Sequence, residues 1–272
     1  GIHSPEFDFE KLPSNVSRAI KDNAIEWPVA LDNDGKTWSS FANRFWPAKY
    51  LFGPDGRIRY RHFGEGAYLE TEYQIRSVLQ ELGEDLSDIS SGVIDHQEQD
   101  PQAFAVTREI YGGYERSYSP GGIYAGQENY YLGPDKTLFY TDDGHYTHNQ
   151  YYLQGVWRNE REAIVHARAT ETPEDYLAIK FAGRAVNVVI NPSRPEPFDV
   201  YIEISGRPLK REEAGRDVRF DDEDRSLIRV EQGRMYRLVE LPDFGVYVLK
   251  LISASDNFAI YAFTFGVYTS GI

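Results

Sequence analysis

Nine short apolar segments separated by turn signals lie between residues 151 and 266. They read YYLQGVWRN, AIVHARATE, YLAIKFAG, AVNVVINP, FDVYIEIS, SLIRVEQG, MYRLVELP, GVYVLKLIS and FAIYAFTFG. Several alternate apolar and polar positions, as in Val200, Ile202 and Ile204, and they recur about every ten residues, as strands with one dry and one wet face do. The sequence therefore predicts an antiparallel β-sandwich in this half of the chain.

Helix and strand signals alternate in the first ninety residues. Apolar residues from Phe7 to Ile20 recur at helical spacing, with Ser14 as the expected N-cap. A short strand in WPVALDNDG and a second helix in TWSSFANRF follow, and then AKYLF, the turn GPDG and RIRYRHF predict a hairpin. A third helix in TEYQIRSVLQELGEDL should end at Gly83 and bury one stripe of residues, namely Tyr73, Ile75, Val78, Leu79 and Leu82.

Composition excludes several classes of partner. The formal charge is −14 and the 29 Lys and Arg residues are scattered, so we expect no nucleic-acid binding. No apolar run is long enough to span a membrane, and the start GIHSPEF does not resemble a signal peptide. The chain has no cysteine, which excludes disulfides, thiolate metal sites and thiol nucleophiles within it. Nothing in the sequence implies a cofactor.

The motifs GIHSPEF and RFWPAKYLFGPDGRIRYRHFGEG, placed among these elements, carry a family resemblance. They resemble the later part of the thioredoxin-like fold, in its TlpA and peroxiredoxin branch and its DipZ-like branch. The segments IYGGYERSYSP, YYLQGVW and YAFTFG are similar to the C-terminal sandwich of that branch, which has carbohydrate-binding-module (CBM) architecture. The resemblance implies a cis-proline at Trp46–Pro47 that could dock an extended peptide. It also implies extracytoplasmic relatives that exchange thiols and disulfides; the location of this chain stays unknown.

The predicted fold class is therefore α/β followed by all-β. We expect a partial thioredoxin-like domain over residues 1–88, a polar linker over 89–104 and a CBM-like or jelly-roll β-sandwich over 105–272. In the family, a strand and a helix that begins with Cys-x-x-Cys precede the point where this sequence starts. The first domain is therefore expected to be truncated and redox-inert. Because the missing strand would lie beside residues 48–53, that edge should pair with another copy of the chain or be covered by other residues.

Two groups of side chains are candidate binding sites. Asp142, Asp143, His145 and His148 could hold a divalent metal through imidazole and carboxylate ligands, although the segment DDG is also ordinary turn chemistry. Sugar rings stack on aromatic faces, and the candidates for such a platform are Tyr111, Tyr114, Tyr118 and Trp157. A polysaccharide or a protein is the expected partner.

Three functional interpretations stay open. The first is a cysteine-free binding or interaction module without redox activity of its own. The second is a hydrolase acting on a carbohydrate or ester, with its site on the sandwich or at the domain junction. The third is a fragment of a redox enzyme whose Cys-x-x-Cys lies upstream.

Overall fold

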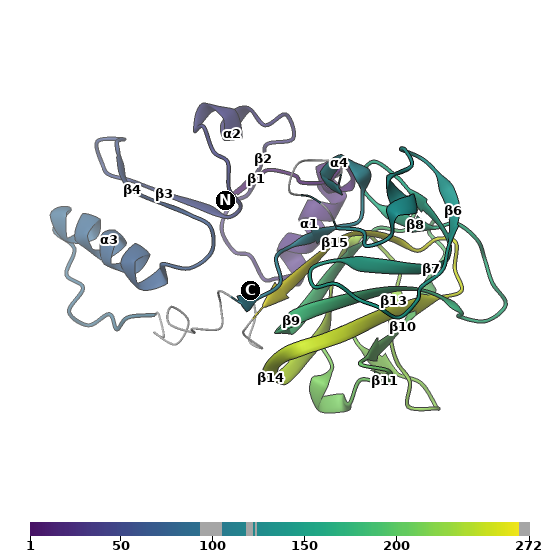
Figure 1. The fold of residues 1–272 in the computed structure, drawn as a ribbon. Helices are drawn as coiled ribbons and strands as arrows, with labels where there is room; N and C mark the ends of the chain where they lie inside the picture. The colour runs from purple at the N-terminus through teal and green to yellow at the C-terminus, as the bar shows by residue number, and fades with distance from the viewer. Residues whose placement is uncertain (93–104, 118–121, 123, 267–272) are drawn as a thin grey trace. The chain divides into compact units, whose positions relative to one another are not determined.

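A computed structural model describes residues 1–92, 105–117, 122 and 124–266, and it separates into two compact units (Figure 1). The N-terminal unit is Gly1–Pro101 and the C-terminal unit is Gln102–Ile272. Most of the predicted linker, residues 93–104, lies outside the described residues. Its boundaries therefore remain a prediction. No helix in the described ranges is both long and apolar enough to cross a membrane.

Over residues 1–92, the N-terminal unit contains two separate two-stranded sheets and three α-helices. Its elements are β1 (Ile2–His3), η1 (Asp8–Lys11), α1 (Pro13–Asp22), β2 (Ala30–Leu31), α2 (Lys36–Ser40), β3 (Ala48–Phe52), β4 (Ile58–Phe63) and α3 (Tyr68–Glu81). β1 pairs with β2 in parallel, and β3 pairs with β4 as the predicted antiparallel hairpin. The N-cap of α1 is Leu12 and not Ser14, because Pro13 occupies the first helical turn, where its fixed φ suits a helix start.

Few apolar side chains of the N-terminal unit are buried. Within the described residues they are Phe7, Val16 and Val78. The stripe predicted on α3 is mostly uncovered, since Tyr73 is 69% exposed and Ile75 and Leu82 are also exposed. The apolar residues of α3 do recur at helical spacing. However, no other element in the described part of this unit covers most of them. This unit therefore has only a fragment of a hydrophobic core.

The C-terminal unit is almost entirely β-structure. Its elements are β5 (Ile110–Tyr111), α4 (Tyr114–Ser117), η3 (Glu128–Tyr131), β6 (Thr137–Tyr140), β7 (Tyr151–Asn159), β8 (Ile164–His166), β9 (Asp175–Ile190), β10 (Phe198–Ile204), β11 (Arg207–Pro208), η4 (Arg211–Glu213), β12 (Arg219–Phe220), β13 (Ser226–Val230), β14 (Arg234–Ser253) and β15 (Ala259–Gly266). Hydrogen bonds join these described strands into one 11-stranded sheet with the main order β12-β13-β10-β14-β9-β15-β8-β7-β6. A sandwich of two separate sheets remains a prediction.

Two long strands, β9 and β14, organise this sheet (Figure 1). The sequence predicts a break in each of them, but both continue through it. In β14 the pairing with β9 shifts register between Glu240 and Gly245. Such irregularities bend and twist a strand without ending it. The first part of β9 can therefore pair with β7 while its second part pairs with β15.

A buried polar cluster fixes the junction of β7, β8 and β9. The His166 imidazole lies 2.8 Å from both Asp175 Oδ2 and the carbonyl oxygen of Ser255. Arg168 donates two hydrogen bonds of 2.6 Å to the Asp175 carboxylate. Burial alone would raise the pKa of Asp175, but the bonds from Arg168 and His166 hold it below its usual value. Gly155, at φ +97°, leaves the space that this carboxylate occupies.

Candidate functional site

The Trp46–Pro47 loop of the N-terminal unit packs beside the end of β1. Its peptide bond is cis, as the family resemblance implies. The Trp46 indole N–H donates to the carbonyl oxygen of Ser4 at 3.2 Å, and its ring lies 4.2 Å from that of Trp38. Trp46 still exposes 50% of its surface. A role for this loop in docking a peptide stays a prediction.

Asp32 links the segment after β1 to the start of α2, because it bonds to Ser4 and to backbone groups of α2. The sequence analysis does not name Asp32 as a site residue. Its buried carboxylate accepts backbone hydrogen bonds from Trp38 and Thr37, both of 2.8 Å, at the start of α2. These two bonds lower the pKa of Asp32. The sequence predicts only a strand ending in a turn for the segment WPVALDNDG that contains it. Asp32 lies four positions before α2, whose N-cap is Gly35, and an Asp close to a helix start is a signal that could have revealed its role.

The edge of β3 that faces away from β4 pairs with no described strand. The Gly64 N–H donates to the Pro47 carbonyl oxygen at 2.9 Å. Because bonding directions alternate along an antiparallel strand, the N–H groups of Ala48 and Tyr50 point toward the unpaired edge. Apolar side chains in and next to this hairpin are also exposed, namely Phe45, Phe52, Ile58 and Phe63. Backbone and side chains of the hairpin thus both offer contact surface.

The loop between β6 and β7 in the C-terminal unit folds around the carboxylate of Asp142. Its Oδ1 accepts the Gly144 N–H at 3.0 Å. Its Oδ2 accepts the hydroxyl of Tyr146 at 2.5 Å and that of Tyr176, from β9, at 2.9 Å. Burial and the neighbouring Asp142 raise the pKa of Tyr146 well above its usual value and that of Tyr176 to about 12. Both phenols therefore remain neutral donors at physiological pH, and they fix the loop to the sheet.

This arrangement engages one of the candidate metal ligands, Asp142, in bonds within the protein. Asp142 is occupied by three donors, and the His145 side chain is exposed beside Asp143. Among the described residues, which include Asp142, Asp143, His145 and His148, no group of three or more His, Cys, Asp or Glu is placed to hold a metal ion. The metal site predicted from these four residues thus gains no support from the described part of the chain and stays a prediction. DDGH is a turn whose carboxylates accept backbone N–H groups.

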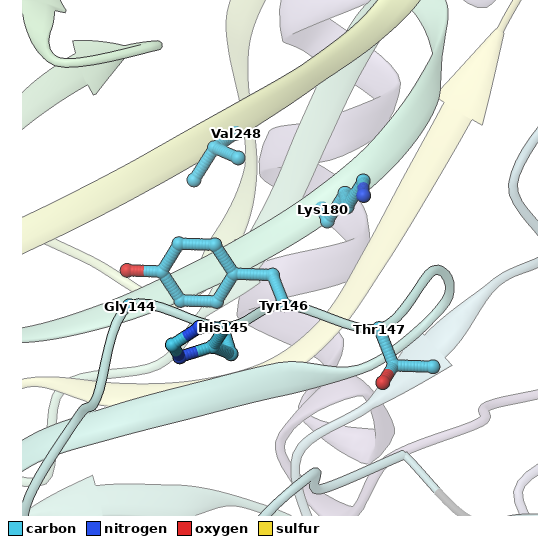
Figure 2. Close-up of a pocket in the computed structure, with 6 residues that line it drawn as sticks. All are labelled: Gly144, His145, Tyr146, Thr147, Lys180 and Val248. Atoms are coloured by element: carbon cyan, nitrogen blue, oxygen red, sulfur yellow. The ribbon is translucent and has the colours of Figure 1, made fainter.

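A surface cavity of about 380 Å³ lies between this loop and the sheet (Figure 2). Its lining consists of Gly144, His145, Tyr146 and Thr147 from the loop, Lys180 from β9 and Val248 from β14. Lys180 and Val248 are direct neighbours in the pairing of the two strands. The Tyr146 ring lies between Val248 and His145 in the close-up, with Lys180 beyond it on the side of Thr147 (Figure 2). The residues that line this cavity thus include a tyrosine, a lysine, a histidine and a threonine.

Two of the four aromatic residues predicted to bind carbohydrate are buried in the core of the C-terminal unit. Trp157 is fully buried, and its indole N–H donates to the carbonyl oxygen of Gln154 at 2.8 Å. Tyr111 is 9% exposed and packs against Tyr124 and Arg116. These two rings are core residues, so a sugar cannot stack on them. Tyr114 begins the short helix α4, and Tyr118 lies outside the described residues.

The fold and these sites define the class. The N-terminal unit has a hairpin that begins after a cis-proline and is followed by a helix. The C-terminal unit is an antiparallel β-structure. This combination is the architecture of a thioredoxin-like protein with an all-β C-terminal domain. The family described as "Thioredoxin like C-terminal domain" matches residues 107–266. The chain belongs to this family.

Two curated relatives match different shares of the chain. "Protein DipZ" of Mycobacterium bovis is 40% identical over 128 residues, which cover 46% of this chain and 18% of DipZ. "Thiol-disulfide oxidoreductase YkuV" of Bacillus subtilis is 25% identical over 80 residues, which cover 29% of this chain and 54% of YkuV. The chain thus spans less than a fifth of the length of DipZ.

Among solved structures, a family two carbohydrate esterase from Cellvibrio japonicus is 14% identical, with a TM-score of 0.32. That likeness covers 49% of this chain and 33% of the esterase. It carries no argument about function.

Proposed function

We propose that these 272 residues act as a binding and interaction module of a thiol–disulfide oxidoreductase system, without redox activity of their own. The observation that supports this proposal is the edge of β3, which pairs with no described strand. The unit that contains this edge also buries few apolar side chains. Backbone groups at a strand edge pair with another strand when one is available. The exposed rings around the hairpin would gain burial in the same step.

Cysteine chemistry would have to come from outside these residues. Thiol–disulfide exchange requires a thiolate to attack a disulfide sulfur, and the sequence contains no cysteine. The resemblance to thioredoxin-like proteins suggests the occupant of the β3 edge, a strand that leads into a cysteine-bearing helix. It would lie upstream of Gly1 in a longer polypeptide or in a partner protein. A second copy of this chain is the alternative occupant, and an extracytoplasmic location is part of the same proposal.

Amide hydrogen exchange tests the edge directly. In dilute protein, the amides of Ala48 and Tyr50 should exchange faster than those of Lys49 and Leu51, which face β4 and serve as the internal control. Protection of Ala48 and Tyr50 that grows with protein concentration, together with a larger mass by light scattering, would identify a second copy as the occupant. Uniform protection in a dilute monomer would show that the edge is already covered and would refute the proposal.

The redox part has an independent test. Insulin reduction by dithiothreitol should run at the same rate with and without this chain. Any clear acceleration would mean that the chain itself exchanges electrons, contrary to the proposal.

Glycan recognition by a CBM-like C-terminal unit is the second candidate function. The cavity beneath the 144–147 loop supports it, because an aromatic ring beside hydrogen-bonding groups is the chemistry that sugar binding uses. A hydrolase is less well supported, because the residues that line the cavity include one imidazole but no carboxylate for acid–base catalysis. The nearby Asp142 is already bonded to two tyrosine hydroxyls.

A further inference from the structure

Lys180 stands out among the cations of the C-terminal unit. Its neighbour across the sheet face, Lys250, lies 4.1 Å from the centre of the Tyr176 ring and is held by it. Lys180 lines the cavity but forms no ion pair with any described residue, although the chain carries 43 acidic residues. A protein of net charge −14 has ample acidic side chains to pair with an ammonium group. An unpaired lysine that lines a cavity therefore points to an anionic ligand.

The aromatic side of the cavity is held in place before any ligand arrives. The Tyr146 hydroxyl is bonded to Asp142, and its ring meets the Tyr152 ring edge-on with centroids 5.3 Å apart. Tyr152 in turn accepts the Thr147 N–H through its hydroxyl at 3.0 Å. The loop is thus attached on both sides of Tyr146, so the ring would lose little conformational freedom on binding. Asp142 acts here as a positioning residue.

We propose that this cavity binds a sugar that carries a carboxylate, such as a uronic acid residue of a polysaccharide. The inference rests on the glycan-binding function proposed above. The carboxylate pairs with Lys180, the C–H face of the sugar ring packs on Tyr146, and sugar hydroxyls bond to Thr147 and His145. Val248 supplies an apolar contact from the sheet. A volume of about 380 Å³ suits one or two sugar units.

The composition of the cavity argues against other anions. A phosphate carries up to two charges and is usually held by Arg or by several backbone N–H groups at once. One lysine and one imidazole match a single carboxylate better. The open lining, with polar groups around a single ring, also differs from the enclosed apolar pocket that a purely aromatic acid would favour.

Titration calorimetry with trigalacturonic acid and its methyl ester tests the inference. The two probes share ring shape and hydroxyls and differ in charge. The acid should bind about ten-fold more tightly than the ester, the difference that one charge-assisted hydrogen bond contributes. Lys180→Met should abolish this preference and Tyr146→Leu should weaken both probes. Lys136→Met, an exposed lysine of the same unit, should change neither.

Each other outcome has a separate meaning. Equal binding of acid and ester, or a preference that survives Lys180→Met, would overturn the acidic-sugar site while glycan binding stands. A loss in Lys136→Met as large as in Lys180→Met would show a general charge effect and would also overturn it. Binding of benzoate as tight as that of trigalacturonic acid would exclude a sugar as the recognised class.

If neither probe nor any neutral oligosaccharide binds, the glycan-binding function itself fails. Circular dichroism on each variant would verify that it folds.

Discussion

The two units of this chain use apolar residues in opposite ways. In the C-terminal unit, the rings and branched side chains of β7, β9, β10, β14 and β15 form one continuous buried core. In the N-terminal unit, Trp46, Phe52 and Ile58 have similar chemistry but remain 44–50% exposed. The contrast shows that apolar content does not make a core by itself. A core requires a second layer or a neighbouring strand that receives the side chains.

Replacement of one tryptophan in each unit should give the largest difference. Trp157→Ala removes a fully buried ring and should cost about 3–5 kcal/mol in the free energy of unfolding of the C-terminal unit. Trp46→Ala removes a half-exposed ring and should cost about 1 kcal/mol. Urea denaturation followed by circular dichroism measures both. Equal losses in the free energy of unfolding would mean that Trp46 also belongs to a packed core, and the two units would then not differ in this way.

A pair of glycines gives a smaller effect and sharpens the comparison. A Cβ at Gly155 would lie 1.9 Å from the Asp175 carboxyl carbon, so Gly155→Ala should cost about 3 kcal/mol through displacement of the buried carboxylate and the strain of a positive φ. Gly56, in the β3–β4 turn, has φ +76° and open space around it. Gly56→Ala should therefore cost only the backbone strain, about 1–2 kcal/mol. Thermal melts of the two variants provide the measurement, and a larger loss for Gly56→Ala would contradict the assigned packing.

The smallest effect expected is a graded loss of stability in acid. The folded state holds the pKa of Asp175 below its unfolded value of about 3.9. The carboxylate therefore contributes stability above that pH, and this contribution is lost as pH falls through the lower folded pKa. The unfolding midpoint of the wild type should drop more steeply below about pH 4 than that of Asp175→Asn, which cannot titrate there. Parallel curves would show that Asp175 has no such role.

Local patterns predicted most elements of both units. Alternation placed β7 at Tyr151–Asn159 and β10 at Phe198–Ile204, and the GPDG turn placed the β3–β4 hairpin, because these signals lie within a few residues of the chain. The same local signals did not predict that β9 continues through Gly183 or that β14 continues through Pro242–Gly245. Residues that usually end strands are tolerated there because pairing on both flanks continues beyond the irregularity.

The candidate sites were less predictable than the elements. Trp157 looks like a sugar platform in the sequence, yet packing places it in the core beside His166 and Phe258. Asp142 and His145 look like metal ligands, yet Asp142 is bonded to tyrosines that lie four and 34 positions along the chain. Lys180 has no distinctive sequence context. It became a candidate only when the 144–147 loop was placed across β9 and β14.

The sequence by itself determined the periodicities, the turns, the hairpin around GPDG, the absence of cysteine and the strong negative charge. All of these follow from residue types and from neighbours close in the chain. Tertiary structure decided which aromatic rings are buried, which carboxylates are already paired, and which lysine lines a cavity without an ion-pair partner in the part of the chain that the structure describes. Those outcomes depend on contacts between residues far apart in sequence, and the free energy of each contact exists only after the strands have come together.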